Sequence, residues 1–262
     1  MKKFRMLIVI SLLMLSGCTK GNDTQTDTLQ QIKNKNEIII ATEGTWQPWS
    51  YHNEDNELVG YDVELGQLIA EKLGVKATFV EAEWDSLFAG LDSKRYDIVI
   101  NGVEITDERL EKYDFSNPYA FIKTAIIVKS DNDEIHSYDD LSGKQTANTL
   151  ASTYATLAEH YGATTTGVDD LSQTIELVLQ NRVDATLNAE VTYYDYMKVH
   201  PEASLKIAAL TDESSLVSIP MRKGQESTAL NQEINKIIDE MIQSGELSQL
   251  SIKYFGTDLV SE

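Results

Sequence analysis

Residues 61–80 read YDVELGQLIAEKLGVKATFV, and this stretch places a helix pattern directly before a strand pattern. Its apolar residues recur near helical spacing at Leu65, Leu68, Ile69 and Leu73. Gly74 stands at a position where helices commonly end. The segment Lys76 to Val80 is then typical of a strand. A helix that leads at once into a strand favours an α/β protein.

The same alternation extends in both directions from this stretch. A strand is predicted at Ile38 to Thr42, a helix at Trp84 to Lys94 and a strand at Tyr96 to Ile100. The pattern pauses around Lys123 to Lys129 and then restarts. Further strands are predicted at 145–150, 164–168 and 184–188, and further helices at 152–161, 171–180 and 190–199. Two successive arrays of this kind predict two lobes.

The C-terminal part supplies a strand at 216–221 and two helices at 227–244 and 245–254. One strand and two helices make a poor separate domain, so this part is expected to complete the first lobe. The expected organisation is a first lobe of residues 37–122 and 217–262 and a second lobe of residues 123–216. The chain would then cross between the lobes twice, which predicts a hinge and an interlobe ligand cleft.

The N-terminus has the layout of an export signal. A basic start, an apolar run from Met6 to Leu15 and two small residues precede Cys18. Because the apolar run is too short to remain as a membrane-spanning helix, residues 1–17 are predicted to be a signal peptide that is removed. Residues 18–36 are predicted to be a flexible tether, because Thr19 to Thr28 contains no apolar residue.

Composition narrows the classes of function. The formal net charge is −20, and an acidic balance of this size argues against nucleic acid as a partner. Cys18 is the only cysteine of the chain, which excludes disulfides and thiolate metal sites elsewhere. The four histidines lack ligand spacing, so neither a metal nor another cofactor is expected.

Six short segments carry a resemblance to a known family. They are EGTWQPW at 43–49, LVGYDVE at 58–64, WDSL at 84–87, LDSKRYDI at 91–98, ITDER at 105–109 and YDFSNPY at 113–119. With these spacings, the chain resembles the polar amino-acid-binding proteins of ABC importers, which are bacterial solute-binding proteins of family 3. The similarity is closest to the cystine-binding branch. It covers about residues 37–258 and is more specific for the family than for the ligand.

The resemblance implies a two-lobed, periplasmic-binding-protein-like fold of type II. It implies a protein without enzymatic activity that captures a polar amino acid, with cystine as the first choice, when two lobes close over it. The captured ligand would pass to an ABC permease in the membrane. The segment Leu15 to Cys18 resembles the lipobox, which implies acylation of Cys18 and an extracytoplasmic lipoprotein anchored to the cell membrane. We expect a monomer.

Arg109 is the predicted clamp for a ligand carboxylate. It follows Thr106-Asp107-Glu108, which is typical of a helix start, so its guanidinium would stand beside free backbone N–H groups and complete an anion site. The resemblance implies that this arginine binds the ligand α-carboxylate with two hydrogen bonds. The alternative is a surface arginine paired with Glu108 or Glu111.

Other site residues are expected from both lobes. Trp46 follows the first strand, where its ring would cover an aliphatic or disulfide-bearing side chain, whereas Trp49 and Trp84 suit a core. The resemblance implies that Asn101 and Gly102 offer oxygens to the ligand amino group, and an ordinary turn is the alternative. From the second lobe, we expect the helix cap Ser152 and its neighbour Thr153 to close over the carboxylate.

Two positions depart from the pattern of the family. Glu104 stands where the family usually has serine or threonine, and Ala189 stands where it usually has the aspartate that holds the ligand amine. One hypothesis is that Glu104, with Glu43, replaces this aspartate as the counter-ion of the ammonium, because an unpaired buried ammonium is costly. The competing hypothesis pairs Glu104 with Arg109 and leaves Glu190 or Asn188 to hold the amine.

Two other classes of function stay open at the level of sequence. The fold also hosts a dehydratase, and Glu43 with Glu104 could form a carboxylate pair for acid and base chemistry. No common hydrolase, P-loop or metalloprotease motif supports that class. A sensory or adhesive lipoprotein without a transport role is the other alternative.

Overall fold

The structure is a computed structural model, and it describes residues 27–260. The predicted signal peptide, the predicted acylation at Cys18 and residues 18–26 of the predicted tether lie outside the described residues. Within residues 27–260, no helix combines the length and the apolar character that crossing a membrane requires.

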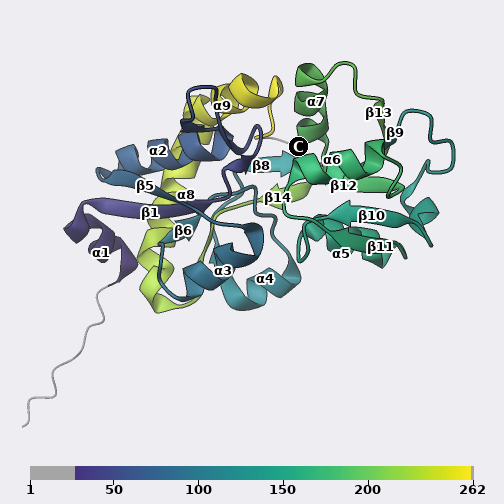
Figure 1. Cartoon of the computed structure of the whole chain (residues 1–262). Coiled ribbons are helices and arrows are strands. Elements are labelled where there is room, and N and C mark those ends of the chain that lie inside the picture. The colour runs from purple at the N-terminus through teal and green to yellow at the C-terminus, as the bar shows by residue number, and fades with distance from the viewer. Residues whose placement is uncertain (1–26, 261–262) are drawn as a thin grey trace, which may run out of the picture.

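The first lobe is built on a parallel sheet with the strand order β5-β1-β6. These strands are β1 (Glu37–Thr42), β5 (Lys76–Glu81) and β6 (Ile98–Val99), and they are joined by helices α2 (Tyr61–Leu73) and α3 (Trp84–Asp92). Alternate residues of β1 serve the two faces, because Ile38 and Ile40 pack with α2 while Ile39 and Ala41 pack with α3. Both faces of the sheet are therefore covered, as a parallel sheet requires (Figure 1).

The second lobe is built on a five-stranded sheet with the order β11-β10-β12-β9-β13. The strands are β9 (Thr124–Lys129), β10 (Gln145–Asn148), β11 (Thr164–Gly167), β12 (Ala185–Ala189) and β13 (Leu205–Leu210). The lobe also holds a 3-10 turn, η1 (Tyr138–Leu141), and helices α5 (Thr153–His160), α6 (Leu171–Leu179) and α7 (Glu190–Val199). β9 runs antiparallel to both of its neighbours, because the chain enters this lobe through it.

Two antiparallel strands connect the lobes. β8 (Ala120–Ile122) leads into β9, and β13 leads back into β14 (Ser215–Val217), which pairs with β8. After this return, β15 (Pro220–Arg222) pairs with β7 (Tyr113–Phe115), and α8 (Gln225–Ser244) and α9 (Glu246–Phe255) pack on the first lobe. Figure 1 shows the two lobes side by side with these strands between them. The predicted fold class, two α/β lobes with two crossovers, is confirmed.

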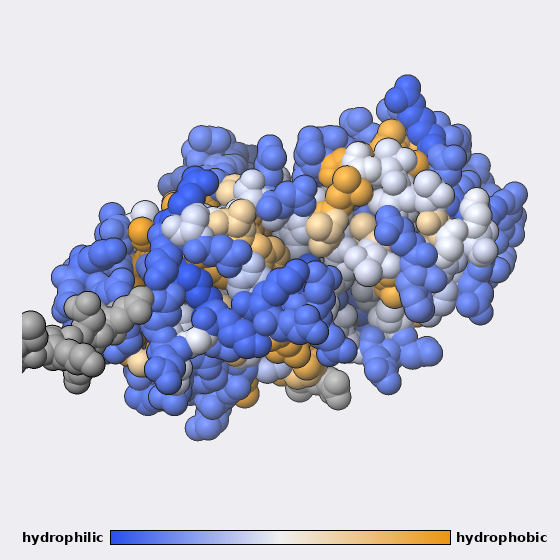
Figure 2. Space-filling view, turned by 90° about the horizontal axis from the view of Figure 1, so that it is seen from below, coloured by the Kyte–Doolittle hydropathy of each residue, from blue (hydrophilic) through white to orange (hydrophobic). Residues whose placement is uncertain are grey.

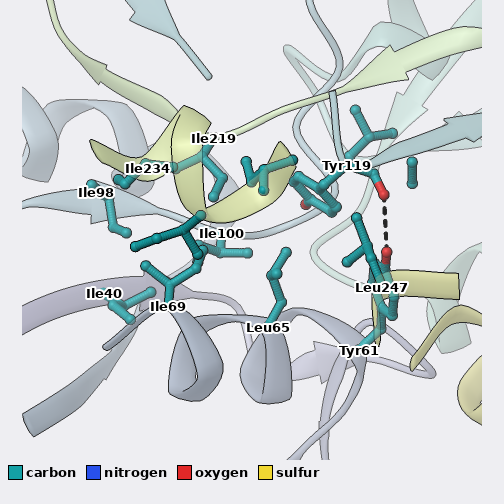
Figure 3. Close-up of a cluster of buried hydrophobic side chains, with 14 of the residues drawn as sticks. Ile40, Tyr61, Leu65, Ile69, Ile98, Ile100, Tyr119, Ile219, Ile234 and Leu247 are labelled. Atoms are coloured by element: carbon teal, nitrogen blue, oxygen red, sulfur yellow. Dashed lines mark hydrogen bonds between the residues drawn. The ribbon is translucent and has the colours of Figure 1, made fainter. Parts of the chain in front are cut away.

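One core cluster joins the two sequence segments that form the first lobe, the N-terminal segment and the C-terminal segment. Figure 3 shows Leu65 and Ile69 of α2 packed among side chains of β1, β6 and α8, while the Tyr61 hydroxyl donates to the carbonyl of Tyr119 at 3.0 Å. Val191, at the start of α7, is buried in the same cluster although the rest of α7 belongs to the second lobe. The junction of β12 and α7 is thus held against the first lobe. Outside the cores, hydrophilic residues cover most of the face drawn in Figure 2, as the net charge of −20 requires.

Three local predictions differ from the structure. The strand predicted at 216–221 is two strands, β14 and β15, which pair with different partners. β13 has no counterpart among the predicted strands. The tether predicted for 18–36 contains helix α1 (Thr28–Lys35), whose cap Asp27 accepts a hydrogen bond from the Gln30 backbone at 2.8 Å. Only two apolar residues mark α1, and one of them, Ile32, is 1% exposed in the core that includes α8.

Three short strands and one short helix complete the first lobe beyond the carboxyl ends of its sheet strands. Strands β2 (Thr45–Trp46), β3 (Ser50–His52) and β4 (Leu58–Val59) form a small antiparallel sheet, and α4 (Asp107–Lys112) follows β6. Because they lie beyond the carboxyl ends of β1 and β6, these elements carry the side chains that face the second lobe.

We predict that Ile32→Ala lowers the free energy of unfolding by roughly 2–5 kcal/mol, because a large buried side chain is truncated in a core that closes poorly around the space. Lys33→Ala is the matched control, since Lys33 is exposed on the same helix, and it should change stability by less than about 0.5 kcal/mol. Urea unfolding of the two variants measures both values. Equal and small effects would show that α1 does not belong to the folded body.

Candidate functional site

A cavity of about 60 Å³ lies between the lobes. The first lobe contributes Glu43, Thr45, Trp46, Trp84, Gly102, Glu104 and Arg109. The second lobe contributes, among others, Asn148, Ser152, Thr153, Tyr154, Asp170 and Asn188. The structure therefore brings together eight of the nine predicted ligand-binding residues, and Asn101 is the one that does not line the cavity. In the described part of the chain, no cluster of side chains has the composition of a metal site.

Arg109 reaches the cavity from the first turn of α4. Thr106 caps this helix and accepts a hydrogen bond from the backbone N–H of Arg109 at 3.2 Å. The guanidinium carbon lies 5.2 Å from the centre of the Trp84 ring and 5.5 Å from that of Phe88, which are cation–π distances. Burial lowers the pKa of Arg109 from its ordinary value, but an arginine with such a high pKa stays charged. The site thus holds a partly desolvated, permanent cation.

Glu104 faces Thr153 across the cleft. Its carboxylate accepts a hydrogen bond from the Thr153 hydroxyl at 2.7 Å, and the residue is 6% exposed. Arg109 donates to the backbone carbonyl of Glu104 at 2.9 Å, and no ion pair joins the two side chains in the described region. The hydrogen bond to Thr153 spans the two lobes, so it closes this side of the cavity directly.

The Trp46 indole brings a polar hydrogen to the cavity, and its buried nitrogen has no hydrogen-bond partner among residues 27–260. The Tyr154 hydroxyl is also buried, and it lies beside the Glu104 carboxylate. Burial, followed by the negative charge of Glu104, raises the pKa of Tyr154, so its hydroxyl keeps the proton. Because unsatisfied buried donors are rare and costly, the Trp46 indole points to an acceptor that the ligand supplies.

Trp46 is held as a platform between both lobes. Its ring stacks on Trp49 with centroids 5.2 Å apart and meets Tyr154 edge-on at 6.4 Å. Gly102 lies beneath this ring at φ +55°, and a Cβ there would stand 2.5 Å from Cζ3 of Trp46. We expected the glycine to give a ligand close access to the backbone. The structure shows that the tryptophan ring uses this space.

Asn101 supports the site from behind. Its side-chain oxygen accepts from the Thr42 hydroxyl at 2.9 Å and from the backbone N–H of Glu43 at 2.8 Å, and its amide nitrogen donates to the Glu43 carboxylate at 2.6 Å. The oxygen that was expected to meet the ligand amine is therefore occupied within the protein. The role of Asn101 in this structure is to fix Glu43.

Glu43 carries a carboxyl group whose pKa is raised to a value near neutral pH. Burial is the main reason that its pKa is raised to about 7; the hydrogen bond from Asn101 opposes this rise, and the negative charges of Asp85 and Asp170 contribute to it. Asp170 lines the same cavity from the opposite lobe and caps α6 through a hydrogen bond from the Gln173 backbone at 2.9 Å. A cation bound between Glu43 and Asp170 would reduce the repulsion between their negative charges.

A buried carboxyl stabilises the floor of the site. Asp62 accepts from the backbone N–H of Gly102 at 2.6 Å and from the Tyr119 hydroxyl at 2.9 Å. Burial raises the pKa of Asp62 to about 8. This network ties α2 and the approach to β8 to the glycine beneath Trp46. No sequence pattern marks it, because Asp62 has the place of an ordinary acidic residue in the first turn of a helix.

The second lobe contributes a helix start and two asparagines. Ser152 caps α5 by accepting from the Ala155 backbone at 3.1 Å, as predicted, and its side chain also lines the cavity. The Asn188 side-chain oxygen accepts from the backbone N–H of Ala189 at 2.9 Å, which leaves its amide hydrogens toward the cavity. Glu190 does not line the cavity, and its backbone N–H donates to the carbonyl of Lys123 at the crossover.

Sequence reasoning missed several residues that line the cavity. Trp84 was expected in the core, and it is 9% exposed with one face under Arg109. Tyr154, Asn148 and Asp170 were not singled out. For Tyr154, the signal was available, since it follows Ser152 and Thr153 on the first turn of α5. For Asp170, only the relative placement of the lobes brings it to the cavity.

Comparisons with known proteins, by sequence and by structure, agree on one family of proteins. Residues 38–257 match the family of bacterial extracellular solute-binding proteins, family 3. The L-cystine-binding protein TcyA of Bacillus subtilis (strain 168) is 39% identical over 262 residues, covering 97% of each chain. An ancestral arginine-binding protein bound to arginine has a TM-score of 0.78 at 35% identity, covering 84% of this chain and 99% of that one. The L-cystine solute receptor of Neisseria gonorrhoeae, in its unliganded open conformation, has a TM-score of 0.62 at 37% identity, covering 90% of this chain and 100% of that one.

The two solved relatives have nearly the same sequence identity to this chain, but they differ in how similar their structures are to it. The TM-score is higher for the arginine-bound protein, 0.78 against 0.62, although the sequence identities are 35% and 37%. The overall structure of the present chain is therefore more similar to that of the arginine-bound relative than to that of the open one. In the present structure, the hydrogen bond between Thr153 and Glu104 joins the two lobes.

We predict that Gly102→Ala destabilises the protein and displaces Trp46. Gly143→Ala is the control, because Gly143 also has a positive φ, +76°, but nothing lies within 4 Å of the position that its Cβ would take. The control should lose roughly 1–2 kcal/mol, the usual cost of this backbone region for a residue with a Cβ. Gly102→Ala should lose more and change the tryptophan fluorescence. Equal losses with unchanged fluorescence would show that Trp46 does not depend on this glycine.

Proposed function

The chain belongs to family 3 of the bacterial extracellular solute-binding proteins, and from this we propose that it captures a polar amino acid and delivers it to an ABC importer. We propose cystine as the first ligand to test, which the 39% identity to an L-cystine-binding protein supports. The observation that carries the proposal is the position of Arg109. A half-buried guanidinium, over the ring of Trp84, lies in a cavity that both lobes line.

The ligand α-carboxylate would bind at Arg109. The guanidinium has five N–H donors, and its hydrogen bond to Glu104 uses one nitrogen, Nη1. A bidentate bond to a carboxylate matches the planar fork of arginine, and hydrogen bonds to charged groups contribute about 1.5–3 kcal/mol each. Thr153, at the start of α5, stands close enough to add a contact from the second lobe.

The ligand ammonium would bind between Glu104 and Glu43. Both carboxylates line the cavity, and Arg109 bonds the carbonyl of Glu104 instead of its carboxylate, which leaves that charge for another cation. The competing assignment to Glu190 has less support, because Glu190 lies at the crossover near Lys123. Asn188 lines the cavity and would contribute polar contacts beside the two carboxylates.

Capture would require the lobes to open and close. With the lobes placed as they are, the hydrogen bond between Thr153 and Glu104 closes one side of the cavity. The ligand would therefore enter when the lobes are apart, and closure would exchange the bond between Thr153 and Glu104 for contacts with the ligand. A ligand shifts the balance only by its preference for the closed form, and a change from 1:99 to 99:1 takes about 5.5 kcal/mol.

The cellular setting follows from the N-terminal sequence. We propose that residues 1–17 are removed, that Cys18 is acylated and that the lipid holds a monomeric protein at the outer face of the cell membrane. Transport by a membrane permease is the role that fits this placement. The relatives are named for binding and not for catalysis, which supports a protein that is not an enzyme.

A thermal-shift screen of the twenty amino acids, cystine and glutathione tests this function. Cystine should raise the melting temperature, because a ligand at 100 times its dissociation constant stabilises the folded form by about 2.7 kcal/mol. Arg109→Lys should abolish most of the shift, since lysine keeps the charge and loses the planar fork. Circular dichroism would verify that this variant folds. No shift with any of these compounds would overturn the proposal.

Calorimetry on two carboxylate variants tests the ammonium site. Glu104→Gln should weaken amino-acid binding, because it removes a carboxylate that faces the ammonium. For Glu43, the ionised form binds the ammonium, so affinity should be complete above pH 7 and fall as the pH decreases through about 7, the pKa of Glu43. Glu43→Gln should remove this pH dependence. An unchanged affinity for Glu104→Gln would favour the competing assignment.

A further inference from the structure

The carboxylate of Glu104 lies at the start of helix α5, which belongs to the opposite lobe. It accepts a hydrogen bond from the Thr153 hydroxyl at 2.7 Å. The Tyr154 hydroxyl lies beside it, so the first two residues of the helix face the same carboxylate. Glu104 is 6% exposed, and the N-terminus of a helix stabilises a negative charge. The second lobe thus binds a carboxylate that belongs to the first lobe.

The start of α5 is also where the sequence predicts that the second lobe meets the ligand carboxylate. Ser152 and Thr153 were expected to close over that group, and both line the cavity. The Thr153 hydroxyl has one hydrogen to donate, and it donates this hydrogen to Glu104. A ligand carboxylate can therefore receive the hydrogen bond only after Glu104 has released it.

The backbone of Glu104 is fixed, although its side chain reaches across the cleft. Glu104 forms an antiparallel bridge with Val217 of β14. The next residue, Ile105, donates to the carbonyl of Leu216 at 2.9 Å. The Glu104 carbonyl also accepts a hydrogen bond from Arg109 at 2.9 Å. The carboxylate can therefore change its partner by rotation of the side chain, while the backbone stays paired with the crossover strand.

A change of partner by Glu104 requires a cation. Release from Thr153 leaves a buried carboxylate without this hydrogen bond, which is costly unless another group replaces it. The ligand ammonium, for which we propose a position between Glu104 and Glu43, is such a group. The exchange then uses both charged groups of an amino acid, because the carboxylate takes the hydrogen bond of Thr153 and the ammonium takes Glu104.

We propose that Glu104 is an internal substitute for the ligand carboxylate. It joins the lobes across the cleft until a ligand enters, then yields Thr153 to the ligand carboxylate and turns to the ligand ammonium. A ligand with only one of these groups leaves either Thr153 or Glu104 without a partner, so the exchange selects amino acids over simple acids and simple amines. This inference rests on the proposed function, because it takes the ammonium as a partner of Glu104.

X-ray scattering from the protein without added ligand tests the first half of the inference. Thr153→Val replaces the hydroxyl with a methyl group of similar size, so it removes the hydrogen bond to Glu104. Thr156→Val is the matched control, because the Thr156 hydroxyl, on the same helix, donates to the Ser152 carbonyl at 3.1 Å within the second lobe. The radius of gyration rises when the lobes separate, and circular dichroism verifies that both variants fold.

We expect Thr153→Val to lower the ratio of joined to separated lobes by roughly tenfold or more, which is the usual effect of one hydrogen bond to a charged group. The radius of gyration should therefore increase for Thr153→Val and stay unchanged for Thr156→Val. An unchanged radius for Thr153→Val, or the same increase in both variants, would overturn the inference.

Calorimetry with cystamine tests the exchange of partners. Cystamine is cystine without its carboxylates, so its ammonium can take Glu104 only by leaving the Thr153 hydroxyl without an acceptor. Thr153→Val removes this penalty, and we expect it to strengthen cystamine binding by up to about tenfold. Thr156→Val should leave cystamine binding unchanged. Cystamine binding that is unchanged or weaker in Thr153→Val would show that Glu104 does not exchange Thr153 for the ammonium.

The failure of this inference and the failure of the proposed function can be told apart. If cystine raised the melting temperature while Thr153→Val changed neither the radius of gyration nor cystamine binding, the proposed function would stand and the internal substitute would be excluded. If none of the amino acids, cystine or glutathione raised the melting temperature, the proposed function would fail, and the inferred exchange with it.

Discussion

The binding cleft depends on one positive charge, that of Arg109, which no ion pair within residues 27–260 neutralises. Arg109 is half-buried against Trp84 and Phe88, and within residues 27–260 its side chain bonds a backbone carbonyl and makes no ion pair. A carboxylate partner inside the protein would compete with the ligand, whereas aromatic faces and a carbonyl stabilise the charge without cancelling it. The charge is left for a ligand carboxylate, and this explains why Glu104, five residues away in sequence, turns toward Thr153 instead.

The remaining polar groups are fixed from behind by residues that never reach the cavity. Asn101 holds Glu43, and Asp62 holds the backbone of Gly102, on which the Trp46 ring rests. Each support saturates its own hydrogen bonds within the first lobe. Site side chains held in this way need little reordering when a ligand arrives, so less of the binding energy is lost to entropy. The side of the site that the first lobe supplies is therefore held in place by the first lobe itself.

The fold and half of the residues that line the cavity were predictable from the sequence, because both depend on local pattern. The spacing of Leu65 and Leu73 defines α2, and Ser152 marks the start of α5 with the side chain that caps it. The contacts of Asn101 with Glu43 and of Gly102 with Trp46 were not foreseen, because these partners are 58 and 56 positions away in the sequence. Asp170 was missed for a related reason. Its place in the cavity depends on how the lobes meet, which no single segment encodes.

The contacts between the lobes fall into two groups, and the difference decides what can move. On the hinge side, the Trp49 indole donates to Thr192 at 3.3 Å, both residues are buried, and neither lines the cavity. On the open side, Thr153 donates to Glu104 at the cavity wall. Opening can break the second contact while the first persists, because Val191 anchors the start of α7 in the core of the first lobe. A ligand can then replace the hydrogen bond between Thr153 and Glu104, and every further contact it makes with the second lobe favours closure.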